Sequence, residues 1–278
     1  MPMNSINTNI GAMVALQSLN RTNDELAGVQ KRISTGLRVS DAKDDGAAFA
    51  VAERIRGDMA ATTSANQQLG AAKGLLEVSS ASLENVSKSL IKLRELVVKL
   101  ADGGLAPEQR GQYQTQVKEV VNNIKSFITD ADYNGRNLLE DPASLTVKVI
   151  INGGGSNYSF NGYSALAGIY NQVSTANSYT QGDAANSMTV TGKLSQAVTN
   201  TLTQLNNFGS YANYIDTQID FNKKILDAQE AGMGALVDAD LAKESARLQA
   251  LQIRQQLGTQ SLGIANQSPQ TLLSLFKG

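Results

Sequence analysis

The sequence contains no histidine, no cysteine and no tryptophan among its 278 residues. Without histidine, the chain cannot form a Ser-His-Asp triad, a Cys-His pair or an H-E-x-x-H zinc site. Without cysteine, it has no disulfide framework, and thiol usage is neutral on the compartment in which it works. We therefore expect a protein that is not an enzyme and needs no cofactor and no metal, although glycosidase chemistry based on carboxylates alone stays open.

The chain also lacks a net charge that would attract a polyanion. Its 24 basic and 25 acidic residues give a formal charge of −1, so we expect no nucleic-acid partner and no anionic membrane surface. No stretch approaches the ~18 uncharged apolar residues of a membrane-spanning helix. The opening residues, MPMNSINTNI, lack the basic and apolar regions of a secretory signal, so we expect no cleavable signal peptide.

Proline is scarce, which permits long helices. Apolar residues recur with alternating steps of three and four in three stretches, as they do along the seam of a coiled coil. Asp102-Gly103-Gly104 supplies a turn between the first two stretches, and Pro107 suits the first turn of the second helix. The three seams are Leu69, Ala72, Leu76, Ser79, Leu83, Val86, Leu90, Leu93, Val97 and Leu100; Tyr113, Val117, Val120, Ile124, Phe127 and Ala131; and Leu194, Val198, Thr201, Leu205, Phe208, Ala212, Ile215, Ile219, Asn222 and Leu226.

Residues 143–192 differ in composition from the seams, with Lys148 and Asp183 as their only charges. Residues 144–151 are rich in β-branched side chains, Asn152-Gly153 favours a tight turn, and aromatic residues alternate with polar ones after it. This pattern predicts a short β-hairpin. We expect the rest of the segment to be an irregular, exposed connection.

Both ends of the chain are free of aromatic residues yet carry apolar residues at helical spacing. Ordering a residue costs about 1.5 kcal/mol, which such modest side chains cannot offset within an isolated arm. We therefore expect the arms to bury these residues against each other or against other copies of the chain. The residues expected to mediate subunit assembly are Ile6, Ile10, Leu16, Leu19, Leu26, Ile33, Leu248, Leu251, Ile253, Leu257 and Ile264.

Long motifs at both ends resemble bacterial flagellins. The start, SINTNIGAMVALQSLNRTNDELAGVQKRISTGLRVSDAKDDGAAFAVAERI, is similar to the flagellin N-terminus, and residues 236–276, with the run Ala-Asn-Gln-Ser-Pro-Gln at 265–270, resemble its C-terminal signature. The stretch Tyr-Asn-Gly-Arg-Asn-Leu-Leu at 133–139 resembles the segment after the second core helix of that family. The middle is far shorter than in many flagellins, so the chain resembles those that keep little more than the filament core.

The expected fold is mainly α: a long antiparallel coiled-coil-like helical bundle, shaped as a rod, with paired N- and C-terminal helices and a short β-hairpin or irregular insert. The resemblance implies that residues 1–42 and 235–278 form the inner filament core. It assigns 43–142 and 193–234 to the outer helical bundle and 143–192 to a short surface insert.

The resemblance also implies a function. It predicts a subunit that assembles with itself into the helical flagellar filament for motility and is exported to the cell exterior by the flagellar type III apparatus. The implied partners are other copies of the chain, an export chaperone, and hook-junction and cap proteins. The alternatives are a hook–filament junction protein and a secreted surface binding module or adhesin, in which Tyr158, Phe160 and Tyr163 would stack on sugar.

Three further groups of residues are considered as sites for calcium, for an innate immune receptor and for sugar attachment. Asp41, Asp44 and Asp45 do not fit a calcium loop, because Lys43 and Ala52 would occupy ligand positions; a turn and a helix start explain them better. In flagellins that a Toll-like receptor recognises, an Arg and a Glu stand at the positions of Lys92 and Gln116, while Leu96 is retained, so we expect weak or no recognition. Flagellin glycosylation suggests sugar attachment in the uncharged segment, at Ser156, Ser159, Ser174, Thr175 and Thr180.

Overall fold

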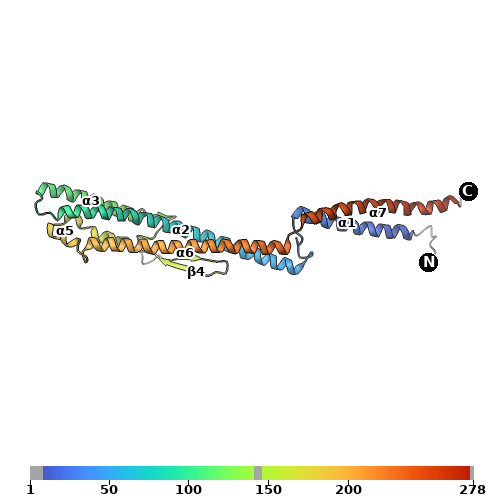
Figure 1. The fold of residues 1–278 in the computed structure, drawn as a ribbon, viewed down its shortest axis with the longest axis horizontal. Helices are drawn as coiled ribbons and strands as arrows, with labels where there is room; N and C mark the ends of the chain where they lie inside the picture. Colours follow the sequence, from blue (N-terminus) through green and yellow to red (C-terminus); the bar gives the residue numbers. More distant parts are fainter. Residues whose placement is uncertain (1–8, 141–145, 276–278) are drawn as a thin grey trace. The chain divides into compact units, whose positions relative to one another are not determined.

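A computed structural model describes residues 9–140 and 146–275, with side chains as far as residue 267. Five long helices dominate it (Figure 1). They are α1 (Ile10–Thr35), α2 (Gly46–Leu100), α3 (Pro107–Thr129), α6 (Lys193–Val237) and α7 (Leu241–Leu275). The chain divides into two compact units, one made by the two chain ends, up to Gly57 and from Ala228, and one made by Asp58–Asp227. The expected mainly α fold, with paired terminal helices and a hairpin, is confirmed.

The core of the Asp58–Asp227 unit is formed where α2, α3 and α6 lie side by side (Figure 1). Every residue of the first predicted seam is buried, and in the third seam buried and half-buried positions alternate from Leu194 to Leu226. The Nζ atom of Lys73 on α2 lies 2.6 Å from Oδ1 of Asp216 on α6. Asn66 on α2 and Asn222 on α6 are also joined by a hydrogen bond. Asn66 precedes Lys73 whereas Asn222 follows Asp216, so the two helices run antiparallel.

The seam predicted on α3 needs one correction. Phe127 is 38% exposed, whereas Ile128 beside it is fully buried. The buried residues, Val117, Val120, Val121, Ile124 and Ile128, follow the 3.6-residue period of a straight helix with a broad apolar face. A strict heptad drifts away from that face by about 20° per repeat, which places Phe127 outside the core.

The predicted hairpin is present. Strands β3 (Thr146–Ile150) and β4 (Asn157–Asn161) pair antiparallel, with Val147 opposite Phe160 on the buried face. The connection runs from Ile151 to Ser156 and starts with a turn in which Gly155 N–H donates to the carbonyl of Asn152 over 3.2 Å.

The expectation of an irregular, exposed connection after the hairpin is wrong in part, because the segment forms short helical elements and eight of its residues between 162 and 192 are buried. The segment forms a π-helical turn η1 (Leu166–Tyr170), the short helix α4 (Asn171–Val173), a 3₁₀ turn η2 (Ala176–Ser178) and helix α5 (Gln181–Ser187). Small and apolar side chains from these turns pack into the core because the segment carries almost no charge that would need solvent. The buried apolar residues are Ala165, Ile169, Val173, Ala176, Tyr179 and Ala184.

The Tyr-Asn-Gly-Arg-Asn-Leu-Leu stretch has a structural explanation. Asn134 and Gly135 have φ values of 55° and 76° and turn the chain between the two-residue strands β1 (Asp132–Tyr133) and β2 (Arg136–Asn137). The Asn137 amide then donates to the carbonyls of Ile128 (2.7 Å) and Thr129 (3.2 Å), near the end of α3. The stretch therefore closes α3 and returns the chain to the core.

Candidate assembly surface

Helices α1 and α7 form an antiparallel pair, called here the terminal pair. The Asn9 side chain caps α1 by accepting from Ala12 N–H, and Gly36 ends the helix in the left-handed region with φ 72°. Asp240 caps α7 by accepting from Ala242 N–H. These local signals fix where both helices begin and where α1 ends.

Polar contacts hold the terminal pair in register. The Asn9 amide donates to the Ala265 carbonyl at one end (2.7 Å), and near the other end Arg32 Nη1 lies 3.5 Å from Glu244 Oε1. Between them, Gln255 Nε2 donates to Asn23 Oδ1 over 2.8 Å. Residues far apart in the sequence are thus matched along the full length of α1.

The inner face of the terminal pair is narrow. Val29 and Leu251 are buried, and Gly258 lets the helices approach, since a Cβ there would lie 3.2 Å from Cδ1 of Leu19. Four of the predicted assembly residues are half-buried beside them: Leu19, Leu26, Ile33 and Leu248. Because Leu251 is already buried within the pair, the structure gives it an intramolecular role.

The outer face of the terminal pair carries exposed apolar side chains. Ile10 and Leu16 are 51% and 48% exposed, and Ile253, Leu257 and Ile264 are 58%, 59% and 70% exposed. Residues 253, 257 and 264 share one side of a helix, because steps of four and eleven are close to whole turns. Met13, Val14 and Leu241 are also exposed, by 64%, 60% and 49%, and Ile6 lies outside the described residues. We call these eight described side chains the outer apolar face.

Beyond the terminal pair, the segment that follows α1 and the segment that follows α6 pair through an isolated β-bridge. Leu37 and Asp238 pair antiparallel, with Arg38 N–H donating to the Val237 carbonyl (2.7 Å) and Ala239 N–H to that of Gly36 (2.9 Å). A small core of Val39, Ala52 and Val237 supports the bridge. This cluster joins the first and last parts of the chain within one compact unit.

The acidic cluster near this bridge acts as the sequence suggested. Lys31 Nζ lies 2.6 Å from Asp41 Oδ2, and this hydrogen bond, with a second from Lys43 N–H, holds the pKa of Asp41 below its ordinary value. Backbone and side-chain hydrogen bonds from Ser40 do the same for the pKa of Asp44. Asp45 accepts from the first-turn N–H groups of α2. Among the described residues, no cluster of acidic side chains has the arrangement of a metal site.

The three residues of the suggested receptor turn differ in exposure and do not share one surface. Lys92 and Gln116 are exposed on α2 and α3, whereas Leu96 is only 4% exposed and belongs to the core. Weak or absent receptor recognition stays a prediction.

The suggested glycosylation positions differ in access. Ser156, Ser159 and Thr175 are exposed and Ser174 is half-buried. Thr180 caps α5, and its hydroxyl donates to Asp183 over 2.7 Å, a bond that lowers the pKa of Asp183. Attachment at Thr180 would compete with that cap, and sugar attachment at these five positions stays a prediction.

The aromatic residues considered as a sugar-stacking surface pack against other parts of the protein. Tyr158 stacks on Tyr214 with ring centroids 4.2 Å apart, and Phe160 is buried against Tyr211. Tyr163 is half-buried over Gly168. The proposed stacking surface of Tyr158, Phe160 and Tyr163 is therefore part of the protein's own packing.

Within the part of the chain that the structure describes, no helix is long and apolar enough to span a membrane.

Comparison with known proteins agrees with the motifs and the fold. The chain is 37% identical over 278 residues to flagellin FljK of Caulobacter vibrioides, and the match covers all of both chains. It is 34% identical to a flagellin of Brucella melitensis, over 99% of this chain and all of that protein. Among solved structures, a flagellar hook-associated protein of Vibrio parahaemolyticus superposes with a TM-score of 0.61 at 17% identity, over 70% of this chain and all of the other, which supports the fold.

Two family models also match. The bacterial flagellin N-terminal helical region matches residues 6–143, and the bacterial flagellin C-terminal helical region matches residues 191–276. The relatives carry the name flagellin and not that of a junction protein or a surface binding module. The resemblance read from the two ends is thus confirmed, and the chain belongs to the bacterial flagellin family.

Proposed function

We propose that this flagellin, a structural subunit of the bacterial flagellar filament, polymerises through the outer apolar face of the terminal pair. Family membership supports the structural, non-enzymatic role in motility and the extracellular location of the filament. One observation supports the mechanism: apolar residues from both ends of the chain lie on a well-formed helix pair and are still about half exposed. Such a surface is costly in water and becomes favourable when another copy covers it.

The magnitude fits a cooperative polymer. Burying the remaining surface of a half-exposed Leu or Ile contributes about 1 kcal/mol, so the eight side chains together contribute on the order of 8 kcal/mol. Association costs about 4–15 kcal/mol in lost freedom. A dimer of two subunits would therefore be only marginally stable, whereas a subunit that contacts several neighbours at a filament end would bind stably. Contacts of this head-to-tail kind continue along a helix and do not close.

The same proposal includes the route and the partners. An extracellular subunit of this family would leave the cell through the flagellar type III apparatus, and an export chaperone would keep its terminal helices apart before export. Hook-junction and cap proteins would then meet the same helices at the two ends of the polymer. The exposed apolar side chains of α1 and α7 support this view, because they would otherwise drive premature association.

The test is elongation of filament fragments by purified monomer. Ile253→Gln with Leu257→Gln removes about 2 kcal/mol of apolar burial per subunit, which should raise the monomer concentration needed for elongation about 30-fold. Gln252→Ala with Gln256→Ala, on exposed positions of the same helix, is the matched control and should elongate normally. Circular dichroism of both monomers checks that helicity is unchanged. Normal elongation by the glutamine variant would show that α7 does not use this face.

A further inference from the structure

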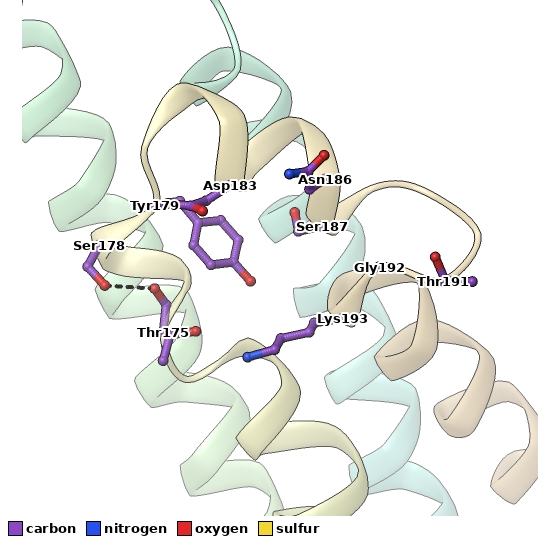
Figure 2. Close-up of a pocket in the computed structure, with 9 residues that line it drawn as sticks. All are labelled: Thr175, Ser178, Tyr179, Asp183, Asn186, Ser187, Thr191, Gly192 and Lys193. Atoms are coloured by element: carbon purple, nitrogen blue, oxygen red, sulfur yellow. Dashed lines mark hydrogen bonds between the residues drawn. The ribbon is translucent and has the colours of Figure 1, made fainter.

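The Asp58–Asp227 unit contains a pocket of about 400 Å³ between η2, α5 and the beginning of α6 (Figure 2). This volume falls within the range of about 300–1,000 Å³ that is typical of small-molecule sites. The lining residues are Thr175, Ser178, Tyr179, Asp183, Asn186, Ser187, Thr191, Gly192 and Lys193. The pocket is separate in the sequence from the helices α1 and α7.

The inner wall of the pocket is held by buried polar side chains. Tyr179 is 7% exposed and Ser187 is 5% exposed. Figure 2 shows the Tyr179 ring projecting into the middle of the pocket, with its hydroxyl on the side of Ser187 and Lys193. Burial raises the pKa of the Tyr179 phenol, and hydrogen bonding with the Thr175 and Ser187 side chains opposes that rise. A phenol is protonated at neutral pH with or without this shift, so Tyr179 can act as a donor.

The walls present both acceptors and donors. The hydroxyls of Ser178 and Ser187 donate to the carbonyls of Thr175 (3.0 Å) and Ala184 (2.8 Å), which leaves their oxygen lone pairs to accept. Asn186, Thr191 and Lys193 complete the lining: Figure 2 shows Asn186 next to Ser187 on α5, Thr191 on the loop before α6, and Lys193 extending toward Thr175. In the described residues these three side chains make no hydrogen bond of their own, so their donors are available.

The charges in the pocket balance. Lys193 brings one ammonium and Asp183 one carboxylate, which the Thr180 hydroxyl and N–H hold in its ionised form. A carboxylate in the lining disfavours a phosphate or another strong anion. Each hydroxyl of a sugar both donates and accepts, which matches a neutral lining of mixed donors and acceptors.

We propose that this pocket binds a neutral polyhydroxylated ligand of the size of one monosaccharide unit, with Tyr179, Asn186 and Lys193 as donors and Asp183 and Ser187 as acceptors. The binding activity is independent of polymerisation and adds a recognition site to a structural subunit. Gly192 is required by the shape of the site, since a Cβ there would lie 2.3 Å from the Ser187 carbonyl oxygen and would force α5 away.

The experiment is a titration of the full-length ¹⁵N-labelled monomer, followed by amide chemical shifts. The probes are the methyl α-glycosides of D-glucose, D-mannose and D-galactose, with inorganic phosphate as the anionic arm. At least one glycoside should shift amides confined to residues 175–193 and saturate with a Kd of about 1–10 mM, as expected for a few hydrogen bonds in a wet site. Phosphate should leave those amides unshifted.

Two substitutions test the assigned donors. Tyr179→Phe removes one hydroxyl and keeps the buried ring, and Asn186→Ala removes one exposed amide. Each should weaken glycoside binding about fivefold, the equivalent of one hydrogen bond. The matched controls are Tyr214→Phe and Asn206→Ala, which lie away from the pocket and should bind as the unmodified chain does.

Three results would overturn the proposal. They are the absence of any glycoside-induced shift at about 50 mM, far above the expected Kd, unchanged binding by both variants, and shifts produced by phosphate instead of the glycosides. Should Tyr179→Phe melt at a lower temperature than the unmodified chain, the exposed Asn186→Ala variant carries the test.

Discussion

Replacing Asn222 should destabilise the Asp58–Asp227 unit more than its single amide suggests. Asn222 is fully buried, although it occupies a seam position that an apolar residue would normally fill. Its amide donates to Asn66 Oδ1 and to the Ile151 carbonyl, both over 2.8 Å, and its oxygen accepts from Gln218 Nε2 over 3.0 Å. One side chain therefore links α2, α6 and the end of the first hairpin strand.

The expected magnitude follows from those bonds. Asn222→Ala removes two donated hydrogen bonds and one accepted bond, each worth about 1 kcal/mol net, and leaves the Ile151 carbonyl with the longer Gln218 bond of 3.2 Å. Because Asn66 is half-buried, water can replace part of its loss. We expect the free energy of unfolding to fall by about 2–3 kcal/mol, which lowers the melting temperature by roughly 5–10 °C in a unit of this size.

The assay is urea unfolding of the monomer by circular dichroism, combined with a double-mutant cycle. Asn66→Ala and Asn222→Ala should show a coupling energy of at least 0.5 kcal/mol, because the two side chains are directly bonded. Thr217→Ala, on an exposed position of the same helix, is the control and should change stability by less than about 0.5 kcal/mol.

A second variant separates hydrogen bonding from lost volume. Asn222→Asp keeps the shape of the side chain but places a buried carboxylate beside the Ile151 carbonyl. Its folded-state pKa should rise, so its loss of stability should be larger at pH 7 than at pH 4, where the protonated carboxyl can again donate. An Asn222→Ala variant as stable as the unmodified chain, or zero coupling with Asn66, would refute the reasoning.

Two further outcomes follow from the structure. Gly153→Ala places a Cβ 2.7 Å from Thr62 Oγ1 and 3.0 Å from the Asp58 carbonyl oxygen, so unfolding should become easier by about 1–3 kcal/mol, whereas Gly154→Ala, with 3.5 Å to its nearest neighbour, should be tolerated in the same thermal melt. The depressed pKa of Asp41 contributes stability that is complete above the unfolded-state value of about 3.9 and is lost as pH falls through the folded value. Acid unfolding of Asp41→Asn should therefore lack that component below about pH 4, and an unchanged acid transition would contradict the role assigned to the Lys31 contact.

The helices and their core faces were predictable because they depend on local periodicity and on proline and glycine signals. Leu69 to Leu100 repeat so regularly that burial followed directly, and Pro107 marks the first residue of α3 as its fixed φ requires. The heptad pattern predicted a buried Phe127, whereas the neighbouring Ile128 is the buried residue, and this shows the limit of that inference. Which of two adjacent apolar residues faces the core depends on how far the helix departs from a heptad, and that is set by its neighbours.

The assembly surface was predictable in kind but not in detail. Leu251 and Leu257 are the same residue type on the same helix, yet one packs against α1 and the other is exposed. Which of the two leucines is buried depends on which side of α7 faces α1. The sequence of one helix alone does not determine this orientation. The pocket in Figure 2 left no signal at all, because Ser, Thr and Asn in an uncharged segment are also the composition of an ordinary loop.

The pairing of α1 with α7 joins residues from opposite ends of the sequence, which has a consequence for folding. Asn9 and Ala265 are separated by 256 positions and Arg32 and Glu244 by 212, so the first helix to be synthesised meets its partner only after nearly the whole chain exists. Closing so long a loop is entropically unfavourable until Asp58–Asp227 has folded and shortened it. Until that closure, α1 lacks the partner against which it packs, and most of the stability of such a helix comes from that packing.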